Sequence, residues 1–354
     1  MKTCCVVVLL AFSLTAAAQD NAAYRQRLAV IHQNIQQFFY DSTKQYYKEF
    51  DKPAANDKSF SYLWPLCALI QAANEMETAG MRQLTTKQVL KAIQAYADTT
   101  GAAPAYASCI TALEKADRFY DDNQWIGIAC MDAYERTHDK LFLAEGEKIY
   151  QYMMTGYDTV TGGGLYWKDG DFTTKNTCSN APGVILALQL YKATRNTEYL
   201  QTALSLYEWT NKHLLSPQAV YYDNVRIPAG TIDTRTYTYN TGTMLQSNVL
   251  LYEITKQQKY LTEAKRLAEG AYTHFFRNGR FPQNAWFNAV LLRGYLALYP
   301  HDNNPKYIDA FKTDAEAIWT TERDSQDLFG RKTKKQLIDQ AAMLEIYARL
   351  LNVK

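Results

Sequence analysis

The sequence has few of the residues that interrupt regular structure, with only 16 glycines and 9 prolines among 354 residues. A chain of many short strands and tight turns needs more of both, so this scarcity favours helices. An excess of charge of one sign is also lacking, because 38 Lys+Arg face 36 Asp+Glu for a net charge of +2. With 47% hydrophobic residues, this balance excludes a disordered chain and argues against a partner such as nucleic acid.

Familiar catalytic and metal-binding motifs are missing as well. The sequence contains no HExxH motif, which argues against a histidine metal site, and no GxSxG motif, which argues against a catalytic serine in a nucleophile elbow. It also has no paired CxxC motifs, which argues against a cysteine-bound metal. The glycines at 162–164 are not followed by the GK[ST] of a phosphate-binding loop, and they suggest a flexible rim instead. The basic run at 331–335 is short enough to be a solvated loop. We therefore expect no metal.

The one apolar run without charge near the N-terminus is too short to span a bilayer, which takes roughly 20 residues. Lys2, the apolar stretch at 6–14 and the alanines at 16–18 predict a signal peptide at 1–18, cleaved after Ala18. We therefore expect an exported protein, periplasmic or secreted, without a membrane span. Residues 19–354 are expected to form a single domain and a monomer.

Cysteine is scarce in the predicted mature chain, because Cys4 and Cys5 leave with the signal peptide. One disulfide could form among the remaining four in an oxidising compartment. The apolar helical surroundings of two of them favour buried thiols instead. The four are Cys67, Cys109, Cys130 and Cys178.

A repeat is present in the second half. Three 18-residue segments that start at Ala133, Leu190 and Leu251 align without gaps, each reading as the end of one helix, a turn and the start of another. They share Tyr, Thr, an aromatic residue, Leu and a small residue at fixed offsets, and a weaker fourth copy starts at Tyr299. The tyrosines at 134, 191, 252 and 299 are 57, 61 and 47 residues apart. Such self-similarity is typical of stacked helical hairpins.

The chain length selects a closed ring of hairpins, because removing 18 residues leaves six units of about 56. We therefore predict an all-α fold, an (α/α)6 toroid or barrel of six helical hairpins, closed by packing the first helix beside the last, with minor strands near 163–175 and 219–238. The inner helices are predicted at about 62–78, 123–137, 178–194, 240–256, 284–299 and 336–351. The outer helices are predicted at about 22–40, 87–97, 141–155, 197–213, 259–275 and 305–321.

In such a ring the loops that lead into the inner helices gather at one mouth. These loops combine aromatic rings with amide or acidic side chains, whereas the turns at the opposite end are plainly polar. Aromatic faces with polar tips suit sugar rings, although most of the 27 tyrosines can be explained by helix packing. Any single Asn or Asp could instead cap its helix. The loops lie at 60–64, 120–125, 175–180, 237–242 and 282–287.

The sharpest motif is the pair Asp121-Asp122 at the start of an inner helix. On sequence alone the pair could be a helix cap that interacts with the helix dipole. In a confined site, however, repulsion and desolvation raise the pKa of one carboxyl group, which leaves one proton donor and one nucleophile. Glycoside hydrolysis needs this division of labour. Adjacent side chains that both face a cleft can reach the separation of about 5–5.5 Å used by retaining enzymes.

The surroundings of this pair resemble a known family. Phe-Tyr-Asp-Asp-Asn-Gln-Trp-Ile-Gly-Ile-Ala (119–129), followed by Tyr-Glu-Arg-Thr (134–137), is similar to the signature of glycoside hydrolase family 76, the endo-α-1,6-mannanases. The segments 162–167, 174–180 and 239–242, which read Gly-Gly-Gly-Leu-Tyr-Trp, Thr-Lys-Asn-Thr-Cys-Ser-Asn and Tyr-Asn-Thr-Gly, also resemble motifs of that family.

The resemblance covers about residues 60–300 and implies an (α/α)6 barrel, in agreement with the hairpin count. It implies a retaining, endo-acting hydrolase of α-1,6-mannan or its oligosaccharides that uses no cofactor, with Asp121 matching the nucleophile and Asp122 the general acid/base. The chain departs from the family at 285–293, where a Phe-Lys-Gly type motif is replaced. Residues expected to contact the sugars are Trp64, Tyr120, Asn123, Trp125, Tyr166, Trp167, Lys175, Asn176, Tyr239, Asn240 and Trp286. For Lys175 and Asn176 a structural role is an equal alternative.

Two other functions remain compatible with the sequence. One is an α/α-toroid carbohydrate enzyme, a hydrolase or a lyase, that acts on a different polysaccharide. The other is a non-catalytic glycan-binding protein on the same scaffold. A transglycosylating cell-wall protein is disfavoured, because the C-terminal Leu-Asn-Val-Lys has no hydrophobic anchoring tail.

Overall fold

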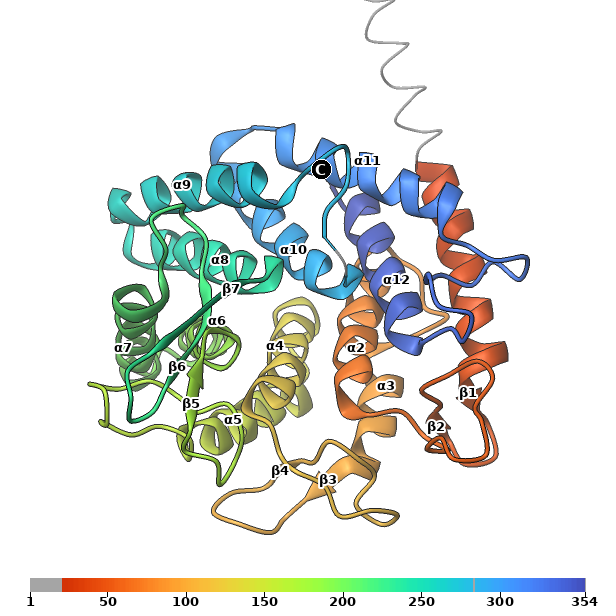
Figure 1. Ribbon diagram of the computed structural model, residues 1–354, viewed down its shortest axis with the longest axis horizontal. Helices are drawn as coiled ribbons and strands as arrows, with labels where there is room; N and C mark the ends of the chain where they lie inside the picture. Colours follow the sequence, from red (N-terminus) through yellow and green to blue (C-terminus); the bar gives the residue numbers. More distant parts are fainter. Residues whose placement is uncertain (1–20, 283, 354) are drawn as a thin grey trace, which may run out of the picture.

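The computed structural model describes residues 21–353 apart from Gln283, so the predicted signal peptide lies outside the described residues. Six inner helices are arranged in a ring, and each packs against the next, with α12 returning to α2 (Figure 1). This is the predicted α/α toroid. The inner helices are α2 (Leu63–Thr78), α4 (Tyr120–Thr137), α6 (Thr177–Thr194), α8 (Thr238–Thr255), α10 (Ala285–Asp302) and α12 (Leu337–Leu351).

The outer helices cover the inner ring, as predicted. The first runs over residues 21–34 and continues as a π-helix, η1 (Ile35–Phe39). It lies beside the C-terminal helices (Figure 1), where Arg27 donates to the Tyr347 hydroxyl at 3.3 Å and the Tyr24 and Tyr347 rings are 5.6 Å apart. These contacts close the ring. The others are α3 (Thr86–Ile93), α5 (Lys140–Met154), α7 (Thr197–Leu214), α9 (Gln258–Phe275) and α11 (Lys306–Thr321).

The sequence repeat marks the turns between inner and outer helices. Thr137, Thr194 and Thr255 each donate a side-chain hydrogen bond to the carbonyl four residues earlier and accept one from the backbone N–H two residues later. The residue after each threonine is left-handed, with φ near 60°, and its N–H bonds the carbonyl of the repeated tyrosine. The repeated small residue lets the two helices approach, since a Cβ on Gly146 would lie 2.6 Å from the Met131 sulfur.

Short strands cross the loops at the mouth of the ring. The largest sheet is antiparallel, in the order β5 (Thr174–Asn176), β6 (Tyr222–Arg226) and β7 (Ile232–Thr236), close to the two strand regions that the sequence predicts. Two hairpins were not predicted: β1 (Tyr40–Asp41) with β2 (Tyr46–Tyr47), and β3 (Ala97–Asp98) with β4 (Ala105–Tyr106). Each hairpin takes over only the last predicted helical residue, Tyr40 or Ala97, because the first helix continues as η1 to Phe39 and α3 continues as a short 3-10 helix, η2 (Gln94–Tyr96).

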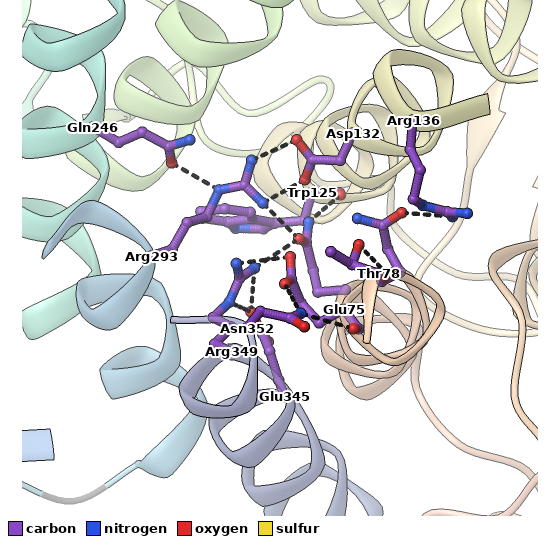
Figure 2. Close-up of polar contacts among 12 residues, drawn as sticks. Glu75, Thr78, Trp125, Asp132, Arg136, Gln246, Arg293, Glu345, Arg349 and Asn352 are labelled. Atoms are coloured by element: carbon purple, nitrogen blue, oxygen red, sulfur yellow. Dashed lines mark hydrogen bonds and ion pairs between the residues drawn. The ribbon is translucent and has the colours of Figure 1, made fainter. Parts of the chain in front are cut away.

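A polar network inside the ring joins the inner helices, and Figure 2 shows its members on α2, α4, α8, α10 and α12. The buried Arg293 guanidinium on α10 donates to Asp132 on α4 at 2.5 and 2.8 Å, to Gln71 on α2 at 2.9 Å and to Gln246 on α8 at 2.8 Å. Gln189 on α6 donates to the same Asp132 carboxylate at 2.6 Å. Arg349 on α12 bonds Glu75 and Glu345. The network therefore ties the ring together through charge-assisted hydrogen bonds.

The four cysteines within the described residues are all free and buried, so the thiol alternative is the correct one. None of the helices in the described part of the chain combines the length and the apolar character needed to cross a membrane.

Candidate active site

A cleft of about 1180 Å³ opens at the mouth of the ring. Its walls come from the first turns of α2, α4, α6, α8 and α10 and from the β5–β6–β7 sheet. The convergence of these loops on one face, predicted from the sequence, is therefore confirmed. The cleft exceeds the 300–1,000 Å³ of typical small-molecule pockets, which suits an extended ligand. It is lined by eight of the predicted site residues: Trp64, Asp121, Asp122, Trp125, Trp167, Asn176, Tyr239 and Trp286.

Asp121 and Asp122 lie in the first turn of α4, half-buried at the cleft. The N-cap position is Phe119, and no side chain caps the helix there, so the pair is not a helix cap. Asp121 Oδ1 accepts from the Asp122 N–H at 3.1 Å, and its Oδ2 accepts from Trp167 Nε1 at 3.2 Å. The indole thus fixes the orientation of one carboxylate while the other stays free to contact a ligand.

The two carboxyl groups differ in proton affinity. Removal from water raises the pKa of Asp121 to about 6, although hydrogen bonds from Cys178 and Trp167 favour its ionised form. Removal from water also raises the pKa of Asp122, and the neighbouring Asp121 charge raises it further. No donor among the described residues bonds the Asp122 carboxylate, so Asp122 keeps its proton more readily than Asp121 does. The arrangement supplies one ionised carboxylate and one protonated acid.

Aromatic side chains form the rest of the cleft wall. Trp286 packs against Trp64 and Trp125, with ring centroids 6.0 and 5.8 Å apart. The cluster continues through Phe287, whose ring centroid is 6.3 Å from that of Trp286 and 4.1 Å from that of Tyr239. Trp286 is nearly fully buried, yet its Nε1 has no hydrogen-bond partner among the described residues. This set offers flat apolar faces and a free donor to a sugar ring.

Asn123, expected to contact sugar, is not brought to the cleft. It is fully buried, accepts from the Tyr106 N–H at 2.8 Å and donates to the carbonyls of Tyr106 and Phe119. Asn180 and Gln340, at the same position of α6 and α12, bind loop backbone in the same way. The amide therefore satisfies buried backbone groups and pins a loop to its helix.

Tyr120 and Tyr166 were expected to contact the sugars, but both are buried and neither lines the cleft. The Tyr120 ring stacks on Tyr152 with centroids 4.9 Å apart. The Tyr166 hydroxyl donates to Asp158 at 2.7 Å. Asn240 is also fully buried, and both of its amide atoms lack a partner among the described residues. None of the three lines the cleft.

Lys175 is fully buried and has a structural role, which was one of the two alternatives left open by the sequence. Its Nζ donates to Asp158 at 2.5 Å and to the Gly163 carbonyl at 2.7 Å. Gly164, with φ of +87°, packs so tightly that a Cβ there would lie 2.6 Å from the Trp209 ring. The ion pair therefore holds the glycine segment against α7, and of the two aromatic residues expected from this rim only Trp167 reaches the cleft.

We expect Lys175→Met to destabilise the fold without abolishing sugar binding. The substitution removes the ammonium that binds Asp158 and the Gly163 carbonyl, and because the Asp158 carboxylate is 34% exposed and stays partly solvated, the cost should be about 1–3 kcal/mol. Thermal unfolding should show a clear fall in Tm, while KM for an oligosaccharide changes little. The exposed pair of Lys312 and Asp309 provides the control, because Lys312→Met should leave the Tm nearly unchanged. A large rise in KM with an unchanged Tm would contradict this assignment.

Several cleft residues were missed from the sequence. They include Asp223 and Asn224 on β6, together with Arg226 on β6 and Arg235 on β7. Asp223 and Asn224 fall within a predicted strand region, but nothing in the sequence showed which face of the strand meets the cleft.

The ring of hairpins and the carboxylate pair in an open aromatic cleft define an (α/α)6-toroid protein of the glycoside hydrolase type. Residues 23–353 match Glycosyl hydrolase family 76. The chain belongs to that family.

Individual relatives agree with this membership. The mannan endo-1,6-alpha-mannosidase DCW1 of Candida albicans is 31% identical over 174 residues, which cover 45% of this chain and 38% of the relative. The chain thus spans about two fifths of the length of that curated relative. The family 76 mannosidase Bt3792 of Bacteroides thetaiotaomicron superposes with a TM-score of 0.85 at 26% identity, over 93% of this chain and 98% of the other. An inactive α-1,6-mannanase variant of Salegentibacter sp. HEL1_6, crystallised with α-1,6-mannotriose, shares the fold with a TM-score of 0.80 at 21% identity, over 94% and 100%.

Proposed function

We propose that this protein hydrolyses internal α-1,6-mannosidic bonds of a mannan with retention of configuration. The observation that carries the proposal is the Asp121-Asp122 pair at the cleft, with the pKa of Asp122 raised above its usual range by burial and by the Asp121 charge. Family membership and the curated mannosidase relatives support the substrate class. An open cleft larger than one sugar ring favours internal cleavage.

In the first step Asp121 attacks the anomeric carbon while Asp122 gives its proton to the glycosidic oxygen. The glycosidic bond breaks, and a glycosyl ester forms on Asp121. In the second step Asp122, now a carboxylate, takes a proton from water, which attacks the anomeric carbon and releases Asp121. Trp167 Nε1, 3.2 Å from Asp121 Oδ2, holds the nucleophile in place.

Digestion of defined polysaccharides tests the proposal. The purified chain is incubated with α-1,6-mannan, α-mannans of other linkages, a β-mannan, glucans and uronic-acid polymers. We expect a ladder of oligosaccharides from α-1,6-mannan alone, with the first-formed reducing end in the α configuration by NMR. Cleavage of another polymer would favour the toroid enzyme of different specificity. Tight binding of α-1,6-mannan with no turnover would favour a glycan-binding protein.

The pH dependence follows from the two pKa shifts. The nucleophile acts only when ionised, so kcat/KM should fall as the pH drops below the Asp121 pKa of about 6. The acid acts only when protonated, so kcat/KM should also fall at higher pH, where Asp122 loses its proton. A bell-shaped profile measured on a soluble α-1,6-mannooligosaccharide checks this expectation. A flat profile from pH 4 to 6 would contradict the role of Asp121.

We propose that the mature protein acts outside the cytoplasm, after removal of residues 1–18. The supporting feature is the N-terminal sequence of Lys2, the apolar stretch at 6–14 and the three alanines. N-terminal sequencing of the exported protein would test it.

A further inference from the structure

Two buried asparagines lie side by side on neighbouring strands at the cleft. Asn176 on β5 pairs in register with Asn224 on β6. The two side chains are 7% and 6% exposed, and both line the cleft. In each of them the carbonyl Oδ1 has no hydrogen-bond partner among the described residues. Buried acceptors are nearly always paired, so two unpaired ones on the same wall point to donors supplied by a ligand.

A hydrogen bond to Asp223 fixes the orientation of the Asn224 side chain. Its Nδ2 donates to Asp223 Oδ2 at 3.0 Å, and the same oxygen accepts from Arg235 at 3.5 Å. Asp223 is itself 7% exposed. Because the N–H₂ group is engaged by the carboxylate, the Oδ1 acceptor is the part of the amide left over for the cleft. Asp223 is thus a positioning residue for Asn224.

A shift in strand register produces this arrangement. In a regular strand Asp223 and Asn224 would point to opposite faces. The β6–β7 pairing shifts between Tyr222 and Asn224, and both Asp223 and Asn224 line the cleft. Such irregularities re-aim side chains and are enriched beside active sites.

The wall lies next to the nucleophile. Cys178 follows Asn176 by two residues in the first turn of α6, and it lies close enough to both Asp121 and Asp223 for each carboxylate to raise the pKa of its thiol. Tyr239 has the same two carboxylates as neighbours. Asp121 and the Asp223–Asn224 pair therefore border the same part of the cleft.

We propose that the Oδ1 atoms of Asn224 and Asn176 accept hydrogen bonds from two hydroxyl groups of the sugar ring that Asp121 attacks, and that Asp223 holds the Asn224 amide in the required orientation. This inference rests on the proposed function and adds the residues that select its substrate. Hydroxyl groups are donors that two amide carbonyls can satisfy, whereas a ring position without a proton to donate leaves the carbonyls unpaired. The wall therefore selects sugar rings that carry free hydroxyl groups at these two positions.

Kinetics on deoxy substrates test the wall. An aryl α-1,6-mannobioside places the sugar that carries the aryl group beside Asp121, and analogues lack its 2-, 3- or 4-hydroxyl. Asn224→Leu should lower kcat/KM on the parent by about tenfold, the cost of one lost hydrogen bond. On the analogue that lacks the matching hydroxyl, Asn224→Leu should cause no further loss. Losses that multiply on all three analogues, or an unchanged kcat/KM on the parent, would overturn the inference.

Two further variants keep the test decisive. If Asn224→Leu fails to fold, Asp223→Ala removes the acceptor that orients the amide and should also lower kcat/KM, with the same analogue insensitive to it. Asn56→Leu, on an exposed loop outside the cleft, is the control and should match the wild type.

Binding separates a failure of this inference from a failure of the proposed function. If the wild type hydrolyses no α-1,6-mannoside, the proposed function fails, and calorimetry with a neutral oligosaccharide still tests the wall. A neutral oligosaccharide should then bind the wild type about tenfold more tightly than it binds Asn224→Leu. Equal affinities for the two proteins would overturn the inference.

Discussion

Asp122→Ala is expected to abolish hydrolysis of α-1,6-mannan while sparing an aryl mannoside with a very good leaving group. Loss of a general acid lowers the rate by about 10²–10⁴-fold when the leaving oxygen needs a proton. A dinitrophenolate leaves without protonation, so the first step on that substrate should be nearly unaffected. Added azide should restore turnover by replacing the water that Asp122 would activate, and the product should be the α-mannosyl azide.

Asp121→Asn should lose activity on both substrates, because no nucleophile remains to form the glycosyl ester. We expect a fall in kcat of about 10⁴-fold or more. Initial rates on mannan and on the dinitrophenyl mannoside measure the contrast. If Asp121→Asn kept its rate on the activated substrate, or if Asp122→Ala lost both activities equally, the two roles would be wrong.

Stability provides the control for both variants. The folded-state pKa of each carboxyl group is raised above its unfolded value, so at neutral pH each group opposes folding, and this penalty disappears as the pH falls below the unfolded pKa. Asparagine removes the penalty, so Asp121→Asn and Asp122→Asn should melt at or above the wild-type Tm at pH 7. Asp309→Asn, on the exposed surface of α11, should change neither activity nor Tm.

Arg293→Met should cause the largest loss of stability. The guanidinium is 6% exposed and carries four hydrogen bonds to three other inner helices (Figure 2). Its removal leaves Asp132 buried without a cationic partner, which costs about 3–5 kcal/mol. For a chain of this size the Tm should fall by roughly 5 °C.

Calorimetry and a second substitution check the source of that loss. Asp132→Leu in the Arg293→Met background should recover part of the lost stability, because it removes the unpaired charge. Arg266→Met breaks an exposed pair with Glu263 and should change the free energy of unfolding by less than about 0.5 kcal/mol. A Tm of Arg293→Met within 2 °C of the wild type would show that the network does not hold the ring together.

The sequence by itself determined the helices, the number of hairpins and the end of the ring that holds the cleft. These features follow from local signals: helical periodicity, the Thr137-type turn and chain length divided by the repeat. The Asp121-Asp122 pair was also visible, because adjacent acids in the first turn of an inner helix must lie at the mouth. Its aromatic setting was specific enough to indicate the family.

Only the tertiary structure decided where each polar side chain of the mouth finds its partner. Asn123 and Asn176 both occur in mouth loops, yet one binds the Tyr106 backbone and the other faces the cleft. Lys175 binds Asp158, 17 residues away, and does not line the cleft. A register shift between β6 and β7 brings both Asp223 and Asn224 into the cleft. A buried polar side chain bonds the donors and acceptors that packing brings next to it. In this fold those groups come from distant segments of the chain, which the local sequence does not specify.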